Sequence, residues 1–346
     1  MICKKILFAL LLYLKTFVLP NGIHKKESRK VMKMSMQTSV AKKTAAPIKN
    51  RNFKKYISLY IMLIPLILYY VLFQYKPMYG NVIAFQDYSI FKGISGSEWV
   101  GLDNFKRFLS TPYFFRTLKN TVLLNLSLLV FSFPMPIIFA LLLNEVRQRK
   151  LKSVIQTLSY MPHFISTVVV AGIVINLLSP SYGIIPMLIE KFTGTRPYLM
   201  VDPNYFRTIY TVMNIWQSMG YGSVVYLAAI TGIDSQLYEA AVVDGANKFR
   251  QIWHITIPGI MPTIMTMLIM RIGNMLGSAT DTILLLYQPA TYEVADTIGT
   301  YVYRNGLLDA DYSYSTAVGL FNSIIGLMLV WGSNTLSKKF TEVGIW

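Results

Sequence analysis

Long apolar runs alternate with short polar segments from residue 56 to the end of the chain. A helix needs about 20 mostly apolar residues to cross the ~30 Å hydrocarbon core of a bilayer, and several runs reach that length. The runs predict six membrane-spanning helices, at about residues 56–75, 121–143, 160–178, 208–230, 259–287 and 316–336. We therefore expect an all-α integral membrane protein with six transmembrane helices, whose membrane domain covers residues 56–346.

A mostly polar segment, residues 234–258, separates the fourth and fifth apolar runs and predicts two short helices joined by a break. Asp234 or Ser235 can cap the first helix with a side-chain oxygen, and Gly245 can end it in the left-handed conformation. Pro258 is expected to stop the second helix before the fifth run begins. A polar hairpin between two membrane helices has little reason to exist unless it docks on another protein, so docking is its expected role.

The charges along the chain favour a membrane protein over a nucleic-acid-binding one. Apolar residues make up 53% of the chain and charged residues 14%, while the formal net charge is +17. The basic residues cluster beside the apolar runs, which the positive-inside rule assigns to the cytoplasm. The rule places a basic turn (Arg147, Arg149, Lys150, Lys152), the hairpin, the N-terminus and the C-terminal anchor (Lys338, Lys339) inside, and an acidic loop (Glu293, Asp296, Asp309, Asp311) outside. Lys106, Arg107 and Arg116 in the long first outside loop depart from the rule, which long loops follow weakly.

The first 55 residues predict a basic N-terminal tail ahead of the membrane domain. Residues 1–20 have the charged and apolar regions of a signal peptide without an Ala-x-Ala cleavage site. Translation that starts at Met32, Met34 or Met36 is the alternative, and it would leave this stretch out of the protein. The rest of the tail is basic and poor in apolar residues, as is typical of a disordered cytoplasmic segment.

The hairpin also carries a Glu-Ala-Ala triplet, then after three residues a glycine, and after nine more the segment Ile-Thr-Ile-Pro. This spacing resembles the cytoplasmic loop signature of binding-protein-dependent ABC importer permeases, although Ile257 stands where that family usually has leucine. The residues beside the glycine are similar to the sugar-importing branch, and Asp244 can also close the turn with its side chain. On this resemblance the coupling-loop residues are Glu239, Ala240, Ala241, Asp244, Gly245, Ala246, Ile255 and Pro258.

The resemblance implies a permease subunit of a bacterial ABC importer in the cytoplasmic membrane, with an oligosaccharide or related carbohydrate as cargo. The implied partners are ABC ATPase subunits that grip the hairpin, a second permease subunit in a heterodimer, an extracytoplasmic solute-binding protein, the carbohydrate and membrane lipid. Closure of the ATPases on ATP would push the hairpin and switch the cavity between inward and outward access. The segment Gly-Leu-Asp-Asn-Phe that starts at Gly101 also resembles a stretch of sugar permeases, and a short amphipathic helix is expected over residues 101–108.

Polar side chains follow one face of each apolar run that flanks the hairpin. The fourth run carries Asn214, Gln217, Ser218 and Tyr221, and the fifth carries Arg271, Asn274, Ser278 and Asp281. Polar groups inside a membrane face protein or water, so the two stripes predict a shared watery path. Asn214, Tyr221 and Asn274 resemble positions that line the sugar in maltose-type permeases. Arg271 has no such support, and it can bind a carboxylate of an acidic saccharide or pair with Asp281. The alternative for all of these residues is ordinary hydrogen bonding between helices.

No motif for catalysis or for a cofactor is present in the sequence. No Gly-x-x-x-x-Gly-Lys-Ser/Thr phosphate loop occurs, so ATP hydrolysis is expected in a separate subunit. Cys3 is the single cysteine, and His24, His163 and His254 lie in separate segments, which predicts no metal site. An ion-coupled secondary transporter is the main alternative, but it predicts carboxylates in several spans, and only Asp281 qualifies. A membrane-embedded enzyme would need convergent His, Asp or Glu residues, which the pattern lacks.

Overall fold

The computed structural model describes residues 57–275 and 280–341. The expected N-terminal tail, residues 1–55 with its signal-like segment 1–20, lies outside the described residues, and so does Ser278. The chain divides into two compact units, Met1–Lys76 and Pro77–Trp346.

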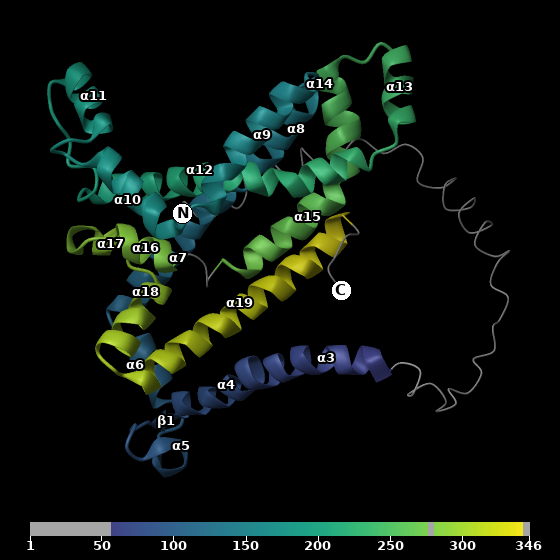
Figure 1. The fold of residues 1–346 in the computed structure, drawn as a ribbon. Helices are drawn as coiled ribbons and strands as arrows, with labels where there is room; N and C mark the ends of the chain where they lie inside the picture. Colours follow the sequence, from purple (N-terminus) through teal and green to yellow (C-terminus); the bar gives the residue numbers. More distant parts are fainter. Residues whose placement is uncertain (1–56, 276–279, 342–346) are drawn as a thin grey trace, which may run out of the picture. The chain divides into compact units, whose positions relative to one another are not determined.

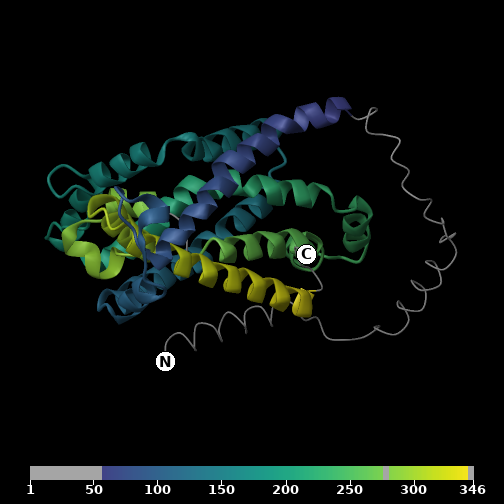
Figure 2. The same cartoon turned by 90° about the horizontal axis from the view of Figure 1, so that it is seen from below.

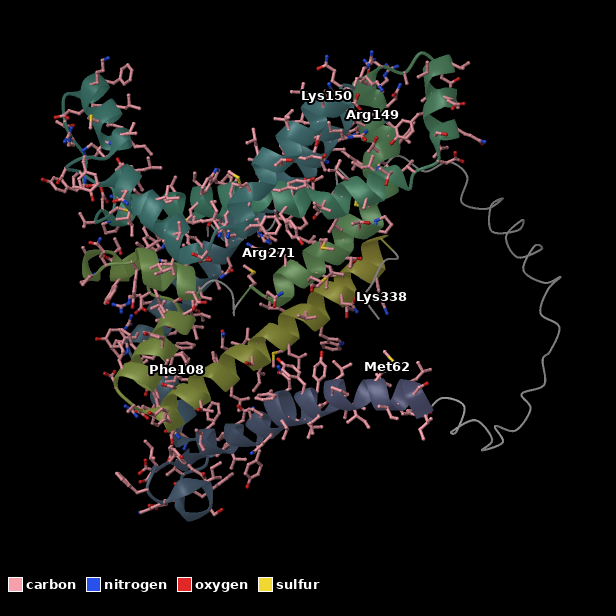
Figure 3. The ribbon with its side chains drawn as sticks, viewed as in Figure 1. Met62, Phe108, Arg149, Lys150, Arg271 and Lys338 are labelled. Atoms are coloured by element: carbon pink, nitrogen blue, oxygen red, sulfur yellow. The ribbon has the colours of Figure 1, made fainter. Side chains whose placement is uncertain are left out.

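The described part of the first unit is one apolar helix. α3 (Ile57–Tyr70) continues without a break into the π-helical turn η2 (Val71–Tyr75), and Pro65 lies inside α3. Apart from Ser58, the side chains on all sides of α3 are apolar or aromatic, including Met62, which Figure 3 labels. A helix that is apolar all round is suited to lipid or to a partner helix, as the first expected span requires.

Short elements open the second unit. They are α4 (Lys76–Met78), which begins at the boundary, η3 (Tyr79–Phe85), β1 (Gln86–Asp87), α5 (Gly93–Gly96), β2 (Glu98–Trp99) and α6 (Asp103–Ser110). β1 and β2 are antiparallel, with Gln86 opposite Trp99. α6 is the amphipathic helix expected over residues 101–108, and its Phe108 is only 1% exposed because it packs among the rings of Phe114 and Tyr301.

The middle of the second unit is built around one long helix. Its elements are α7 (Tyr113–Ser127), η4 (Leu128–Ser132), α8 (Pro134–Glu145), α9 (Arg149–Phe164), α10 (Thr167–Leu178), α11 (Ile184–Thr193) and α12 (Pro203–Thr231). α12 packs against α8, α9 and η4 (Figure 1). Near its start Phe206 and Tyr210 belong to a core cluster with α7, α10 and α16, and near its end Tyr226 and Ile230 belong to another with α8 and α15.

The last part of the chain turns back along α12. Its elements are α13 (Ser235–Val243), α14 (Lys248–Gln251), η5 (Ile252–Thr256), α15 (Ile257–Gly273), α16 (Thr280–Leu286), η6 (Pro289–Thr291), α17 (Tyr292–Ala295), α18 (Ile298–Tyr303), η7 (Arg304–Leu308) and α19 (Tyr312–Thr341). α15 and α19 lie side by side in Figures 1 and 2. α13 follows the C-terminal end of α12, whereas α17 packs beside its N-terminal end, so these two helices mark opposite ends of the unit.

Among the described residues, four helices are long and apolar enough to cross a membrane: Ile57–Phe85, Tyr113–Glu145, Lys248–Gly273 and Tyr312–Lys339. α9 and α10 are bent by 99° at a short break and form a fifth candidate if the pair counts as one span. The expected fourth span, residues 208–230, lies within α12, which is 29 residues long but not among these helices. Polar side chains interrupt its apolar surface, so the number of six spans stays a prediction.

Two helix boundaries differ from the expected ones. Pro258 does not stop the second helix of the hairpin, because the helix runs from Lys248 through η5 and α15 to Gly273. The π-helical turn η5 absorbs the hydrogen bond that Pro258 cannot donate, as such turns commonly do. The expected fifth span, 259–287, is not one helix: α15 ends at Gly273, a weak helix former, and α16 starts separately.

The crossing of α12 and α9 depends on Gly220. A Cβ atom added there would overlap the backbone of Ser159 on α9. We expect Gly220→Ala to destabilise the protein by about 1–3 kcal/mol, the usual cost of forcing extra atoms into a packed contact. Thermal melting of the purified protein measures this. Gly172→Ala, on α10, is the control, since its added Cβ would meet nothing within 4 Å. Equal melting temperatures for the two variants would show that the close contact between α12 and α9 at Gly220 does not constrain this position.

Candidate functional site

The first arm of the hairpin, α13, is capped as the sequence predicts. The carboxylate of Asp234 accepts a hydrogen bond of 3.0 Å from the backbone N–H of Gln236. Gly245 ends the arm with φ +75°, in the left-handed region. The predicted role of the Asp244 side chain is wrong, because its carboxylate bonds no other residue in the described part of the chain. Backbone bonds close the turn instead, from the N–H of Gly245 to the carbonyl of Val242 at 3.0 Å and from the N–H of Ala246 to the carbonyl of Ala241 at 2.8 Å.

Side chains that the sequence analysis missed join the two arms. The hydroxyl groups of Tyr238 on α13 and Thr256 on η5 lie 2.9 Å apart in a hydrogen bond. Asn247 caps α14 by accepting from the N–H of Arg250, and Gln251 donates to the carbonyl of Ala246 at 2.9 Å. Asn247, directly before a helical run, was a visible capping signal. No signal in the sequence indicates the Tyr238–Thr256 hydrogen bond, since it joins residues 18 apart. The arms therefore form one braced unit that continues into α15.

The surface of this hairpin is unusually exposed. α13 contains no buried residue, and Glu239 and Ala240 are open to their surroundings. Apolar side chains are exposed with them, including Val243 at 87% and Phe249 at 72%. A hollow of about 390 Å³ lies between the arms, lined by Tyr238, Glu239, Val242, Lys248 and Gln251. Exposed apolar groups on a short polar hairpin are typical of a docking surface.

The remaining residues of the loop motif lie on either side of the turn. Ala241 and Ala246 are half-buried at the turn, Ile255 is half-buried in η5, and Pro258 is exposed in the first turn of α15. The basic turn lies at the same end of the unit, where Figure 3 labels Arg149 and Lys150 close to the hairpin. An ion pair of 3.6 Å between Lys248 and Glu145 joins this end of α8 to α14.

The two residues expected on the path from α12 have different environments. The side-chain oxygen of Asn214 accepts a hydrogen bond of 2.8 Å from Ser132 on η4, so part of this amide serves helix packing. The bond belongs to a polar seam between α12 and α7–η4, in which Ser127 also contacts Thr211 at 3.0 Å. Tyr221 is 46% exposed, and its ring stacks face to face on His163 at 4.1 Å. His163 is a residue of this surface that the sequence analysis did not single out.

The residues expected on the path from α15 are less constrained. Asn274 is exposed at the end of α15, where it donates to the carbonyl of Met270 and to no other described residue. Arg271, labelled in Figure 3, is half-buried one turn earlier and lies within electrostatic range of the phenol of Tyr210 on α12. No ion pair or hydrogen bond joins Arg271 to another described residue, and Asp281 is exposed. The structure therefore shows no Arg271–Asp281 pair.

A charged cluster at the opposite end of α12 was not foreseen. Asp296 is fully buried, and its Oδ2 atom accepts from Arg116 at 3.1 Å and from Arg304 at 2.6 Å. Its Oδ1 atom accepts from Thr300 at 2.7 Å. Burial alone would lower the pKa of Arg304, but the hydrogen bond and charge of Asp296 outweigh it and raise that pKa above its ordinary value.

The cluster extends to α12 through an amide. Asn120 on α7 donates to the carbonyls of Glu293 and Asp296, and its oxygen accepts from Arg207 at 3.2 Å. The sequence placed Asp296 only as an acidic loop residue and Arg116 as an exception to the charge rule. The departure of Arg116 from the charge rule was the available signal that opposite charges meet here.

The family model described as "binding-protein-dependent transport system inner membrane component" matches residues 132–342. The chain belongs to this family. The match covers the hairpin and both polar stripes of the permease, and it leaves the ion-coupled alternative without support. The permease is thus a transport subunit and a multi-pass membrane component.

Close relatives and solved structures agree with this membership. The permease is 45% identical over 287 residues to protein LplB of Bacillus subtilis, covering 83% of this chain and 90% of the relative. It is 48% identical over 288 residues to the polygalacturonan/rhamnogalacturonan transport system permease protein YteP of the same species, again covering 83% and 90%. A bacterial alginate ABC transporter, solved with an alginate pentasaccharide-bound periplasmic protein, has a chain 42% identical to the permease with a TM-score of 0.79, covering 85% of this chain and 98% of that one. The architecture of type I ABC permeases is therefore shared.

Proposed function

We propose that the permease carries an acidic oligosaccharide through the membrane, in an ABC importer driven by ATP. Two observations support this substrate class. The relative YteP is named for polygalacturonan and rhamnogalacturonan, and a second similar structure, 43% identical with a TM-score of 0.78, is described as importing the acidic polysaccharide alginate. The observation in this chain that carries the proposal is Arg271, a half-buried guanidinium that no described carboxylate neutralises. Such a group favours an anionic cargo, since its charge is otherwise uncompensated.

The hairpin α13–α14 is proposed as the contact with the ATPase subunits, on the cytoplasmic side. Its exposed apolar residues and hollow offer a surface that a cleft of another protein can hold. The Tyr238–Thr256 bond and the unbroken helix from Lys248 to Gly273 would transmit a push on α13 directly to the end of α15 that carries Arg271. Motion at the ATPases would thereby change access to the path, which is alternating access. A second permease subunit would supply the other wall, and a solute-binding protein would deliver the cargo from outside.

The path itself is proposed to run along Asn214, Tyr221, Arg271 and Asn274. Tyr221 and its stacked partner His163 offer an aromatic surface to the C–H face of a sugar ring. The amide nitrogen of Asn214 bonds no other described residue and would donate to a sugar hydroxyl, because Ser132 occupies the side-chain oxygen. Arg271 would bind a carboxylate.

The experiment reconstitutes the permease with its partner permease, ATPases and binding protein in liposomes. A labelled galacturonate trisaccharide is expected to enter only when ATP is hydrolysed, and a neutral galactose trisaccharide is expected to enter much more slowly. Arg271→Gln should lower acidic uptake about tenfold or more, because a hydrogen bond to a charged group contributes about 1.5–3 kcal/mol. Asp281→Asn is the control, since Asp281 is exposed and unpaired within the described residues. Equal uptake of both trisaccharides by the wild-type transporter would contradict the proposed substrate class.

A further inference from the structure

The cluster around Asp296 holds more positive charge than its own acid can neutralise. Three guanidinium groups, from Arg116 on α7, Arg207 on α12 and Arg304 on η7, meet at one carboxylate and one amide. The neighbouring Glu293 contributes only a backbone carbonyl, and its carboxylate makes no ion pair with any residue of the described ranges. One negative charge therefore faces three positive charges.

Hydrogen-bond donors are also in surplus. Both oxygens of the Asp296 carboxylate are already occupied, by Thr300 and by the two arginines. The buried Nε atoms of Arg116 and Arg207 have no partner among the described residues. A network that existed only to pin the loop to α7 would need one arginine for one aspartate, because buried polar groups without partners are costly.

Two of the three arginine side chains remain partly exposed. The side chains of Arg116 and Arg304 keep 34% and 21% of their surface exposed. Tyrosine rings hold both groups in place: the ring of Tyr113 lies 4.7 Å from Arg116, and that of Tyr292 lies 4.9 Å from Arg304. Fixed, partly exposed guanidinium groups are well suited to bind a carboxylate, since they lose little freedom on binding.

The cluster lies in line with the proposed path. Arg207, Asn214 and Tyr221 are spaced seven residues apart along α12, and this spacing puts them on one face of the helix. The phenol that lies within range of Arg271 belongs to Tyr210, three residues beyond Arg207. Because α13 leaves the other end of α12, the arginine cluster is at the end away from the hairpin. If the hairpin is cytoplasmic, the cluster faces the outside.

We propose that Arg116, Arg207 and Arg304 form a carboxylate-binding site at the outward mouth of the path, which receives a uronate unit of the incoming saccharide. Asp296 holds Arg116 and Arg304 in position, Asn120 holds Arg207, and the cargo supplies the missing negative charge. Arg271, further along the path, is then the next partner for the same carboxylate. The inference rests on the proposed function, because an uncharged saccharide would not neutralise the surplus positive charge of the arginines.

The test measures binding of a labelled galacturonate trisaccharide to the complete, detergent-purified transporter by equilibrium dialysis. The ATPases carry a substitution that prevents hydrolysis and are saturated with ATP, so that the transporter stays in one conformation. The binding protein is omitted. Arg207→Gln removes the charge but keeps an amide that can donate to Asn120. We expect it to weaken binding at least tenfold, and Arg207→Lys to restore most of the affinity. Lys119→Gln is the matched control, since it removes an exposed charge next to Asn120 and should change binding less than twofold.

The outcomes separate the two proposals. Unchanged galacturonate binding by Arg207→Gln, with wild-type preference for the acid over galactose trisaccharide, would overturn the site and leave the proposed function standing. Equal binding of acidic and neutral trisaccharides by the wild type would overturn both. If Arg207→Gln fails to assemble, Arg116→Gln decides, because Asp296 then still pairs with Arg304. Weakening by Arg116→Gln supports the site, and unchanged binding refutes it.

Discussion

Gly245→Pro is expected to release the ATPase subunits from the transporter while the permease still inserts in the membrane. Proline fixes φ near −65°, whereas Gly245 needs +75°, and proline also removes the N–H that bonds Val242. The turn then cannot form, and α13 loses its position against α14. Affinity purification through a tag on the permease measures the effect: the ratio of ATPase to permease should fall at least tenfold, and ATP-driven uptake should be lost.

Gly194→Pro is a matched control for this variant. Gly194 ends α11 with the same φ of +75° and donates its N–H to Glu190 at 2.8 Å, so proline does equal damage to the backbone. Gly194 lies before the N-terminal end of α12, whereas the hairpin follows the C-terminal end of that helix. ATPase should co-purify with Gly194→Pro as with the wild type. Full retention of ATPase by Gly245→Pro would contradict the proposed docking role of the hairpin.

The hairpin could be predicted because its determinants are local. A helix cap needs only the residue at the cap and the backbone two or three positions on, as Asp234 shows. The left-handed turn at Gly245 likewise follows from the residue itself. The continuation of the helix through Pro258 could not be predicted in this way. It depends on a π-helical turn that Thr256 and its bond to Tyr238 help to hold, and this bond joins the two arms of the hairpin.

The polar seam and the arginine cluster show the limit of pattern reasoning in a membrane chain. A stripe of polar residues such as Asn214 and Tyr221 says which face of a helix is polar, but not whether a neighbouring helix or a cavity meets it. The structure shows a serine of η4 bonded to Asn214 and an aromatic ring against Tyr221. Asp296 gathers groups from α7, α18 and η7, and through Asn120 from α12, and no periodicity in one segment encodes that meeting.

Asp296→Asn is expected to be the most damaging single substitution for stability. It would leave Arg116 and Arg304 converging on a buried position without a counter-charge, and removing one partner of a buried ion pair costs about 3–5 kcal/mol. The effect should lie toward the lower value, because both guanidinium groups are partly exposed. Thermal melting of the purified transporter and the yield of assembled complex measure it. Asp103→Asn is the control: its pair with Lys106 is 68% and 74% exposed, and such surface pairs contribute about 1 kcal/mol or less. If the two variants melted alike, Asp296 would not be what holds the arginines together, and the positioning role assigned to it at the mouth of the path would be wrong.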